Sequence, residues 1–359
     1  MERCDLGRRA VLRGGLGLGV ALAMGGASGV ARGGAMRGTV GRGGRVPVMY
    51  YDLRAMGSLR RGYVPGTVGG YGQRVGVLFG DGGNTLVYAG DDATLVVDSK
   101  IAPFGALVRE DARRFAGGTI TLLNTHHHAD HTGGNEAFAG CEIIAHEKAM
   151  PRIASQLDRY KEGAVGGAQA ARNIENESKR AQATATAEAF VAKADALAAK
   201  DFTPTRTLGD GTSGLEVGGR KIVVHHFGAG HTDNDLVVHL PEENVVHTGD
   251  LVFNGLHPFF DGPGGATSEG WIRSLRKAAE LCDAETVVVP GHGEITDRAG
   301  IDSMATYFEQ VRDAVRGAIA AGKTEEEIRQ IRVPAFEGRG FEQFAGRLLD
   351  WVRAEMVGG

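Results

Sequence analysis

The densest group of chemically reactive side chains in this chain lies within six consecutive residues. His126, His128, Asp130 and His131 follow an apolar, strand-like run and lie just before two glycines. Neutral imidazole and carboxylate are suitable ligands for zinc, which they bind at about 2.0–2.2 Å. So many polar groups on one turn are unfavourable unless something binds them. We therefore predict a metal-binding loop here in preference to an ordinary polar turn.

Three more potential ligands each lie beside a glycine near the end of a later apolar run. They are His231, Asp250 and His292. Glycine has no Cβ, so it lets the backbone approach a crowded centre closely. A lone histidine at a strand end is usually structural, but three such motifs after the first cluster indicate a shared site. We expect four loops to converge on one sheet edge and to supply seven ligands.

The order of these residues resembles the metallo-β-lactamase superfamily over roughly residues 70–300. The resemblance implies two metal ions and divides the ligands between them. The first ion would bind His126, His128 and His231, and the second would bind Asp130, His131 and His292. Asp250 would bridge both ions, as in the glyoxalase II-like, thioesterase, lactonase and nuclease branches. The zinc β-lactamases themselves have Cys or no ligand in this region.

Two positions bear on the metal and on the branch of the family. Flavodiiron relatives have Glu where this chain has His128, so the resemblance implies two Zn²⁺ ions and not a redox di-iron centre. Iron and manganese also fit a site of His and Asp. The wider run 231–235, with 258–261 and 264–265, resembles exported members of the family, in which Asn234 is more often Gly.

Two zinc ions about 3.5–4 Å apart can share a water molecule and lower its pKa toward about 7. The resemblance therefore implies hydrolysis of an ester, thioester, lactone or lactam by a metal-bound hydroxide that Asp130 orients. The chain offers no rival nucleophile, since it lacks Gly-x-Ser-x-Gly, and Cys141 and Cys282 lack basic neighbours. The alternatives are a phosphodiesterase, a sulfur dioxygenase with one iron, and a metal-binding protein without turnover.

Two further residues are candidates for supporting roles. Asp98 ends a predicted strand, at a position where the family has an Asp that supports the metal-binding loop. Such a carboxylate accepts an N–H from a ligating imidazole and fixes its tautomer. A simple Asp-Ser turn explains Asp98 equally well. His257 lies in a loop rich in Pro and Phe after Asp250, where it is a candidate substrate contact.

Apolar and β-branched runs separated by Gly or Asp predict two groups of short strands. The first group covers 74–79, 84–89, 93–98, 119–124 and 142–145, and the second covers 215–217, 221–226, 236–240, 245–248 and 286–289. Helices are expected at 103–115, 268–282 with Ser268 as the cap, 297–321, 324–331 and 339–355. This order suits an αββα sandwich of two mixed β-sheets with flanking helices over 71–335, and 336–359 would add a C-terminal helix to the same domain.

Residues 147–200 interrupt this pattern and are rich in Ala, Lys, Glu and Gln. We predict a helical insertion there, with a hairpin that breaks near Gly163–Gly167. Its apolar periodicity is weak, so most of its surface should contact solvent. A lid, a dimer surface and a spacer are all consistent with this composition.

The N-terminal residues 1–31 resemble an export signal. Arg8 and Arg9 precede an uncharged, weakly apolar run at 16–31 that ends in small residues. This is typical of twin-arginine export to the periplasm or beyond, and an ordinary secretory signal is the alternative. A retained anchor would need about 20 mostly apolar residues, so we expect no stable membrane anchor after processing. Residues 32–70 are rich in Gly and Arg and should form an irregular lead-in.

The charge of the chain narrows the choice of partner. The formal net charge is −4, and removal of the first 31 residues makes it −6. An acidic protein is a poor match for a nucleic-acid backbone, so we expect a small-molecule substrate. The oligomeric state stays open. Cys141 and Cys282 could pair in an oxidising compartment, but we favour two separate core residues.

Overall fold

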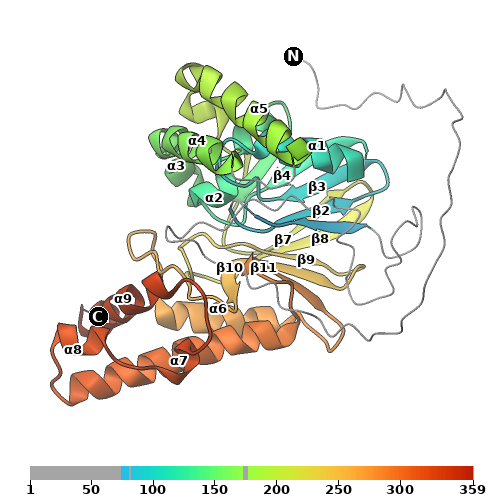
Figure 1. The fold of residues 1–359 in the computed structure, drawn as a ribbon. Coiled ribbons are helices and arrows are strands. Elements are labelled where there is room, and N and C mark those ends of the chain that lie inside the picture. Colours follow the sequence, from blue (N-terminus) through green and yellow to red (C-terminus); the bar gives the residue numbers. More distant parts are fainter. Residues whose placement is uncertain (1–73, 81, 116, 173–176, 359) are drawn as a thin grey trace, which may run out of the picture.

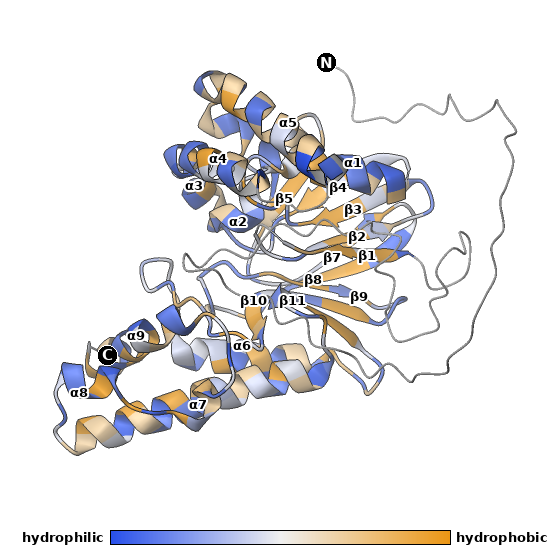
Figure 2. Cartoon of the chain, viewed as in Figure 1, coloured by the Kyte–Doolittle hydropathy of each residue, from blue (hydrophilic) through white to orange (hydrophobic). Residues whose placement is uncertain are grey.

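The computed structural model describes residues 74–358 except 81, 116 and 173–176, so the proposed export signal and the lead-in lie outside the described residues. Two β-sheets face each other, and helices cover the outer face of each sheet (Figure 1). The αββα sandwich of two mixed sheets is confirmed. Apolar residues concentrate on the strands and on the inner faces of the helices (Figure 2).

Two mixed sheets form the centre of the sandwich. The six-stranded sheet has the order β1 (Val75–Leu78), β2 (Thr85–Ala89), β3 (Ala93–Val97), β4 (Thr119–Leu123), β5 (Glu142–His146) and β6 (Arg206–Leu208). The five-stranded sheet has the order β11 (Val287–Gly293), β10 (Val245–Asn254), β9 (Val237–Leu240), β8 (Arg220–His226) and β7 (Gly211–Val217). Strands β3 to β6 are parallel, as are β10 and β11. The short strand β6 was not predicted, because it lacks an apolar run.

Helices cover the outer faces of both sheets and form the C-terminal layer. On the first sheet lie α1 (Gly105–Phe115), α2 (Ala129–Thr132), α3 (Ala149–Ala154), α4 (Leu157–Ala171) and α5 (Glu177–Lys193), with 3-10 turns at Asn135–Phe138, Ala194–Ala196 and Ala199–Asp201. Beyond the second sheet lie α6 (Ser268–Glu280), α7 (Arg298–Ala320), α8 (Glu325–Arg329) and α9 (Ala345–Gly358), with 3-10 turns at Pro334–Phe336 and Glu342–Phe344. None of the helices within the described ranges is long and apolar enough to cross a membrane.

The helix α6 shows how the sequence pattern becomes packing. Trp271 and Leu275 lie one turn apart on its buried face, and the Trp271 ring packs 4.4 Å from that of Phe308 on α7. The N-cap is Thr267 and not the expected Ser268, because the Thr267 hydroxyl accepts a hydrogen bond from the N–H of Gly270. The thiol of Cys282, just after α6, is free and buried, so Cys282 does not pair with Cys141.

The predicted break in the insertion is wrong. Helix α4 runs unbroken through Gly163 and Gly167, and the chain turns back only after Ala171. Gly167 packs against Pro103, and a Cβ built there would lie 2.6 Å from the Pro103 Cδ. This glycine therefore permits close packing and does not end the helix. The inner face of the insertion is also buried, with Tyr160 at 1% exposure, so the insertion adds to the core.

The contact between Gly167 and Pro103 predicts that substitution by alanine affects stability differently at Gly163 and at Gly167. Alanine is about 1 kcal/mol more favourable than glycine in a helix interior. A Cβ at Gly163 meets only the Ala102 carbonyl oxygen at 3.9 Å, so Gly163→Ala should raise the free energy of unfolding. Gly167→Ala should not raise the free energy of unfolding, because the new Cβ forces the Pro103 ring to move. Urea denaturation measures both, and equal effects of the two substitutions would contradict the packing argument.

Candidate metal centre

The seven predicted ligands meet at one end of the two sheets. The loop after β4 carries His126 and His128, and the following helix α2 carries Asp130 and His131. The loop after β8 carries His231, whereas Asp250 and His292 lie within the longer strands β10 and β11. Both strands extend beyond their predicted ends, because the register between them shifts at Gly249 and the pairing then continues to Asn254 and Gly293.

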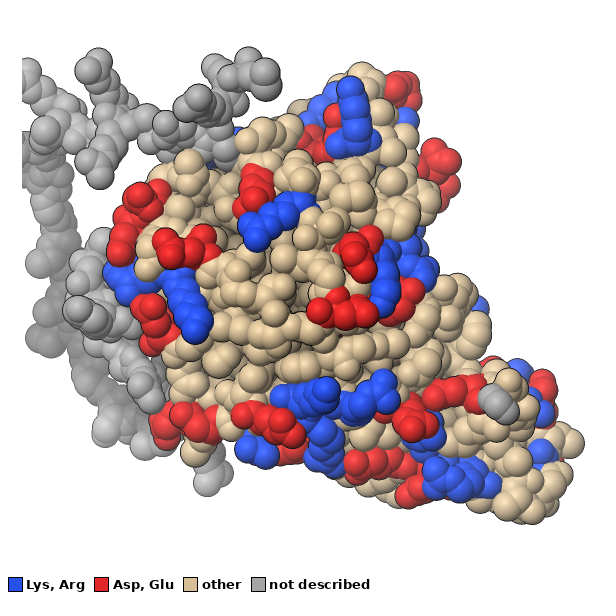
Figure 3. Space-filling model, turned by 180° about the vertical axis from the view of Figure 1, so that it is seen from behind, with Lys and Arg blue, Asp and Glu red and all other residues tan. Residues whose placement is uncertain are grey.

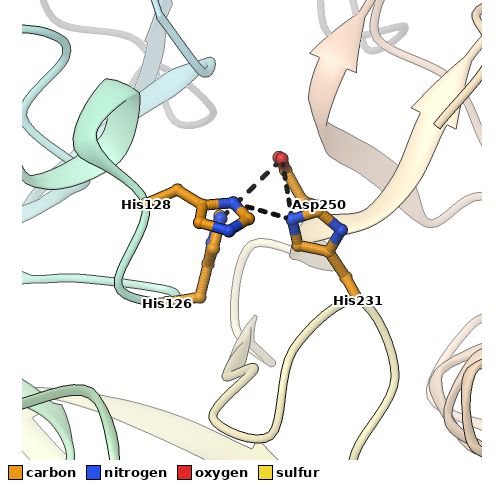
Figure 4. Close-up of side chains that lie close together, drawn as sticks. All are labelled: His126, His128, His231 and Asp250. Atoms are coloured by element: carbon orange, nitrogen blue, oxygen red, sulfur yellow. Dashed lines mark hydrogen bonds and ion pairs between the residues drawn. The ribbon is translucent and has the colours of Figure 1, made fainter. Parts of the chain in front are cut away.

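The first group of ligand atoms surrounds one point (Figure 4). His128 Nδ1 lies 3.0 Å from His231 Nε2, and His231 Nε2 lies 3.4 Å from Asp250 Oδ2. His126 Nε2 lies 3.8 Å from the same carboxylate oxygen. Each of the four residues contributes one atom to a group spanning no more than 4.8 Å.

The second group lies on the other side of Asp250. His292 Nε2 is 3.2 Å from Asp130 Oδ2 and 3.3 Å from Asp250 Oδ2. His131 Nε2 is 3.1 Å from Asp250 Oδ1. Asp250 therefore faces both groups, as a bridging carboxylate must. The side chain of Asp130 is 35% exposed and that of Asp250 only 3%, so the second group forms the open side of the centre.

The donor atoms fit transition-metal ions. Ligands of a tetrahedral zinc lie roughly 3.3–3.6 Å apart, given bonds of 2.0–2.2 Å. The separations of 3.0 to 3.8 Å given above fall around this value. Moreover, within the described part of the chain, the buried atoms His126 Nε2, His131 Nε2 and Asp250 Oδ1 make no hydrogen bond of good geometry, although the last two face each other at 3.1 Å. A buried polar atom without a partner destabilises the protein, and a cation at these positions would satisfy all three.

Glycine makes the approach of β11 to β10 possible. Gly291 packs directly against the carboxylate of Asp250, and a Cβ at this position would overlap Asp250 Oδ1. Gly249, which precedes Asp250, has a φ of 52°, in the left-handed region that glycine adopts freely. The expected role of the glycines beside the ligands is confirmed at these two positions.

Two imidazoles of the first group, those of His126 and His231, are neutral. Burial lowers the pKa of His126 well below its ordinary value, and the neighbouring His131 lowers it further. Burial likewise lowers the pKa of His231 to about 3, against the opposing effect of Asp250. A neutral imidazole has the free lone pair that a metal ion requires. These two side chains are thus already in the ligating form.

The second group holds imidazolium–carboxylate pairs. Burial by itself would lower the pKa of His292, but the carboxylates of Asp250 and Asp130 raise it to about 9. Burial is also overcome at His131, where Asp250, Asp130 and Asp98 raise the pKa well above its ordinary value. The carboxylates therefore create a strongly negative potential at this position. A metal ion would supply the positive charge that protons supply here.

Asp98 supports the second group from behind. Its Oδ2 accepts hydrogen bonds from His131 Nδ1 at 2.7 Å and from the Thr125 hydroxyl at 2.8 Å. Its Oδ1 accepts from the backbone N–H of Thr125 at 2.8 Å. These bonds fix the His131 tautomer so that Nε2 faces the metal position. Of the two interpretations of Asp98, the structure favours support of the ligand loop over a simple turn.

Asp261 supports the first group as Asp98 supports the second, by a contact with the ring of one ligand. Its Oδ2 lies 2.8 Å from His128 Nε2, and the N–H of Gly264 donates to its Oδ1 at 3.0 Å. This contact leaves His128 Nδ1 free to face His231. This role of Asp261 was not predicted from the sequence. Its one signal was the resemblance of the run 258–261 to exported relatives, which assigns no function to a single residue.

The insertion and the loop 231–235 hold the backbone of His127. Asn234 Oδ1 accepts the His127 N–H at 3.0 Å. Gln156 Nε2, just before α4, donates to the His127 carbonyl at 2.6 Å. Arg152 on α3 forms an ion pair with Asp233 at 2.6 Å. The insertion thus stabilises the ligand loop.

His257 is not brought to the cluster. Its Nδ1 lies 2.7 Å from the Tyr307 hydroxyl and its ring packs against Phe336, so it belongs to the C-terminal layer. The expectation of a substrate contact at His257 therefore has no support from its position. The residue is 2% exposed, and its packing explains its burial.

A separate group of His146, Asp210 and His226 has ligand-like spacing but different hydrogen bonding. The N–H of Lys148 donates to His146 Nδ1, which places the imidazole proton on Nε2, facing Asp210 at 3.2 Å. A nitrogen that carries a proton is no metal ligand. His146 therefore belongs to a hydrogen-bonded group of three residues and offers no free nitrogen to a metal.

Comparison with known proteins agrees with the fold and the site. Residues 78–292 match the family described as the Metallo-beta-lactamase superfamily. A metallo-beta-lactamase type 2 of Bacillus cereus is 23% identical over 192 residues, or 54% of this chain and 59% of the relative. The chain thus spans less than two thirds of that relative. A hydroxyacylglutathione hydrolase of Rhodospirillum rubrum is 72% identical over 32 residues, or 8% of this chain and 12% of the relative.

A solved structure shows the same fold. A metallo-beta-lactamase family protein from Thermus thermophilus is 22% identical, with a TM-score of 0.51 over 77% of this chain and 89% of that chain. The segment that matches the family includes all seven ligand positions and more than half of the 359 residues. The chain therefore belongs to the metallo-beta-lactamase superfamily.

Proposed function

We propose that this protein is an exported binuclear zinc hydrolase that cleaves an ester, thioester, lactone or lactam. The observation that carries the proposal is the position of the Asp250 carboxylate, which lies within 3.1 to 3.4 Å of nitrogen atoms in both groups of ligand atoms, those of His231 in the first and of His131 and His292 in the second. One such carboxylate offsets the repulsion between two nearby dications. A protein with a single iron would have no need of this arrangement.

Some residues of the site would bind the metal ions, and Asp130 would also orient the attacking water. Zinc ions held by the two groups would supply Lewis-acid chemistry, namely the activation of water and the polarisation of the scissile carbonyl. Asp130 is ionised, because His131 and His292 lower its pKa against the effect of burial. Its partly exposed carboxylate accepts a hydrogen bond from the attacking water and so directs the oxygen lone pair toward the substrate.

Two features support a small acyl substrate. One relative is named a beta-lactamase and another a hydroxyacylglutathione hydrolase. In addition, basic and acidic side chains lie next to each other on the face that Figure 3 shows, without a continuous basic surface there. Nucleic-acid binding depends on a positively charged surface, and the formal net charge of −4 weakens the phosphodiesterase alternative.

The proposal is tested by a panel of substrates on the mature, zinc-loaded protein. The panel contains thioesters, lactones, β-lactams and phosphodiesters, and each is measured before and after chelation. We expect hydrolysis of at least one acyl substrate, its loss on chelation and its return with zinc. Hydrolysis of phosphodiesters alone, or undiminished turnover in metal-free protein, would reject the proposal.

Asp250→Asn tests the bridge directly. The amide keeps the shape of the side chain but removes the negative charge, so the second metal should be held weakly. His126, His128 and His231 suffice for one zinc. We expect a folded protein with about one zinc equivalent and little activity. Elemental analysis beside turnover measures both, and two tightly held zinc ions with near-normal rates would contradict the bridging role.

Asp261→Ala tests the support of the first group. Loss of the carboxylate frees the His128 ring to rotate, so zinc affinity should fall by about 10- to 100-fold. Asp210→Ala is the matched control, because it removes a carboxylate from His146, which lies outside the centre. Competition with a chromogenic chelator gives the affinities. Equal affinities in the two variants would show that the Asp261 contact does not orient the ligand.

Export is tested on the full-length precursor. Replacement of both Arg8 and Arg9 by Lys should leave the precursor in the cytoplasm, because the twin-arginine route depends on this pair. The control replaces Arg3 and Arg13, which lie in the same segment but outside the pair. Fractionation followed by immunoblotting locates the protein. Normal export of the Arg8/Arg9 variant would indicate the general secretory route.

A further inference from the structure

Three phenylalanines lie side by side next to the metal centre. Phe259 follows β10, whereas Phe341 and Phe344 belong to the segment between α8 and α9. We call these three residues the aromatic rim. All three are only half-buried, unlike the rings of the core. Phe341 and Phe344 lie outside residues 78–292, so the family match gives them no role.

The aromatic rim spans both groups of ligands. The Phe259 ring lies 5.7 Å from the His128 ring in the first group. It also lies 5.6 Å from Phe344, which in turn lies 5.7 Å from Phe341. The Phe341 ring then lies 6.4 Å from His292 in the second group. A continuous series of ring contacts therefore connects one proposed metal position to the other.

The backbone holds the distal part of the aromatic rim in place. The N–H of His257 donates to the Gly340 carbonyl at 2.8 Å, and the N–H of Gly340 donates to the Gly255 carbonyl at 3.0 Å. The Arg339 guanidinium lies over the Tyr307 ring at 4.8 Å. Phe341 itself has a φ of 62°, which is unfavourable for a residue with a Cβ. Such a conformation persists only where the surrounding contacts impose it.

We propose that the aromatic rim binds an arylmethyl or bulky alkyl group attached directly to the scissile carbonyl. This inference rests on the proposed hydrolase function. Small-molecule sites combine apolar walls with a few polar groups that fix orientation, and here the metal ligands are the polar groups. Because each end of the aromatic rim lies one ring contact from a ligand, the apolar group must be next to the reacting carbon and not at the end of a long tail.

The test compares the binding of phenylacetate and acetate to zinc-loaded protein by calorimetry. These acids correspond to the acyl products of aromatic and small substrates. We expect phenylacetate to bind at least about 10-fold more tightly, which is the scale of discrimination that apolar pockets achieve. Phenylacetyl and acetyl thioesters of one thiol should show the same preference in kcat/KM.

The variants Phe259→Ala and Phe344→Ala should reduce the phenylacetate-to-acetate ratio toward one, with zinc content unchanged. Phe227→Ala is the matched control, because Phe227 is half-buried at the end of β8 but packs against His225 and Lys277. Phe341→Gly removes a third ring at a φ that glycine adopts without strain, so the test does not depend on one variant folding.

The outcomes separate this inference from the proposed function. Equal binding of the two acids, or a ratio retained in all three variants of the aromatic rim, would overturn the inference even if acyl substrates are hydrolysed. A strong preference for phenylacetate that falls in these variants would support it. The same preference without hydrolysis of any acyl substrate would support the apolar subsite and reject the hydrolase proposal.

Discussion

One carboxylate, Asp250, lies buried between two groups of imidazoles, and the rest of the site depends on its position. Burial opposes the charge on this side chain, yet the neighbouring His292 and His131 lower its pKa well below the ordinary value. A buried negative charge is stable only when positively charged groups lie close to it. The fold must therefore bring β10 and β11 close together, and Gly291 leaves the space for this.

The ligands are held by a surrounding layer of hydrogen bonds from different parts of the chain. Asp98 at the end of β3 orients His131, and Asp261 from the loop after β10 orients His128. Gln156, between α3 and α4, holds the backbone of the ligand loop. Outer contacts of this kind fix ring orientation, so they set metal affinity although they do not touch the ion. The insertion is thus part of the architecture of the centre.

The C-terminal segment extends this architecture to the substrate side. Residues near Gly340 pair with the loop that leaves β10, and this pairing brings Phe341 and Phe344 to the open side of the centre. The metal ligands lie within the matched segment 78–292, whereas two of the three rings that border them lie beyond it. The candidate metal ligands and most of the proposed aromatic rim therefore come from different parts of the chain.

The αββα sandwich and the order of the candidate ligands could be predicted from the sequence, because local donor density and hydrophobic periodicity are readable along the chain. The sequence could not determine which atoms face one another. Asp261 and Phe344 lie far from His126 in sequence, and no local motif assigns a role to either residue, so only tertiary packing shows that they border the centre. Tertiary packing also explains Gly167, which was expected to break a helix but instead permits close contact with Pro103. His257 was expected to contact substrate because of its loop position, but it packs against Tyr307.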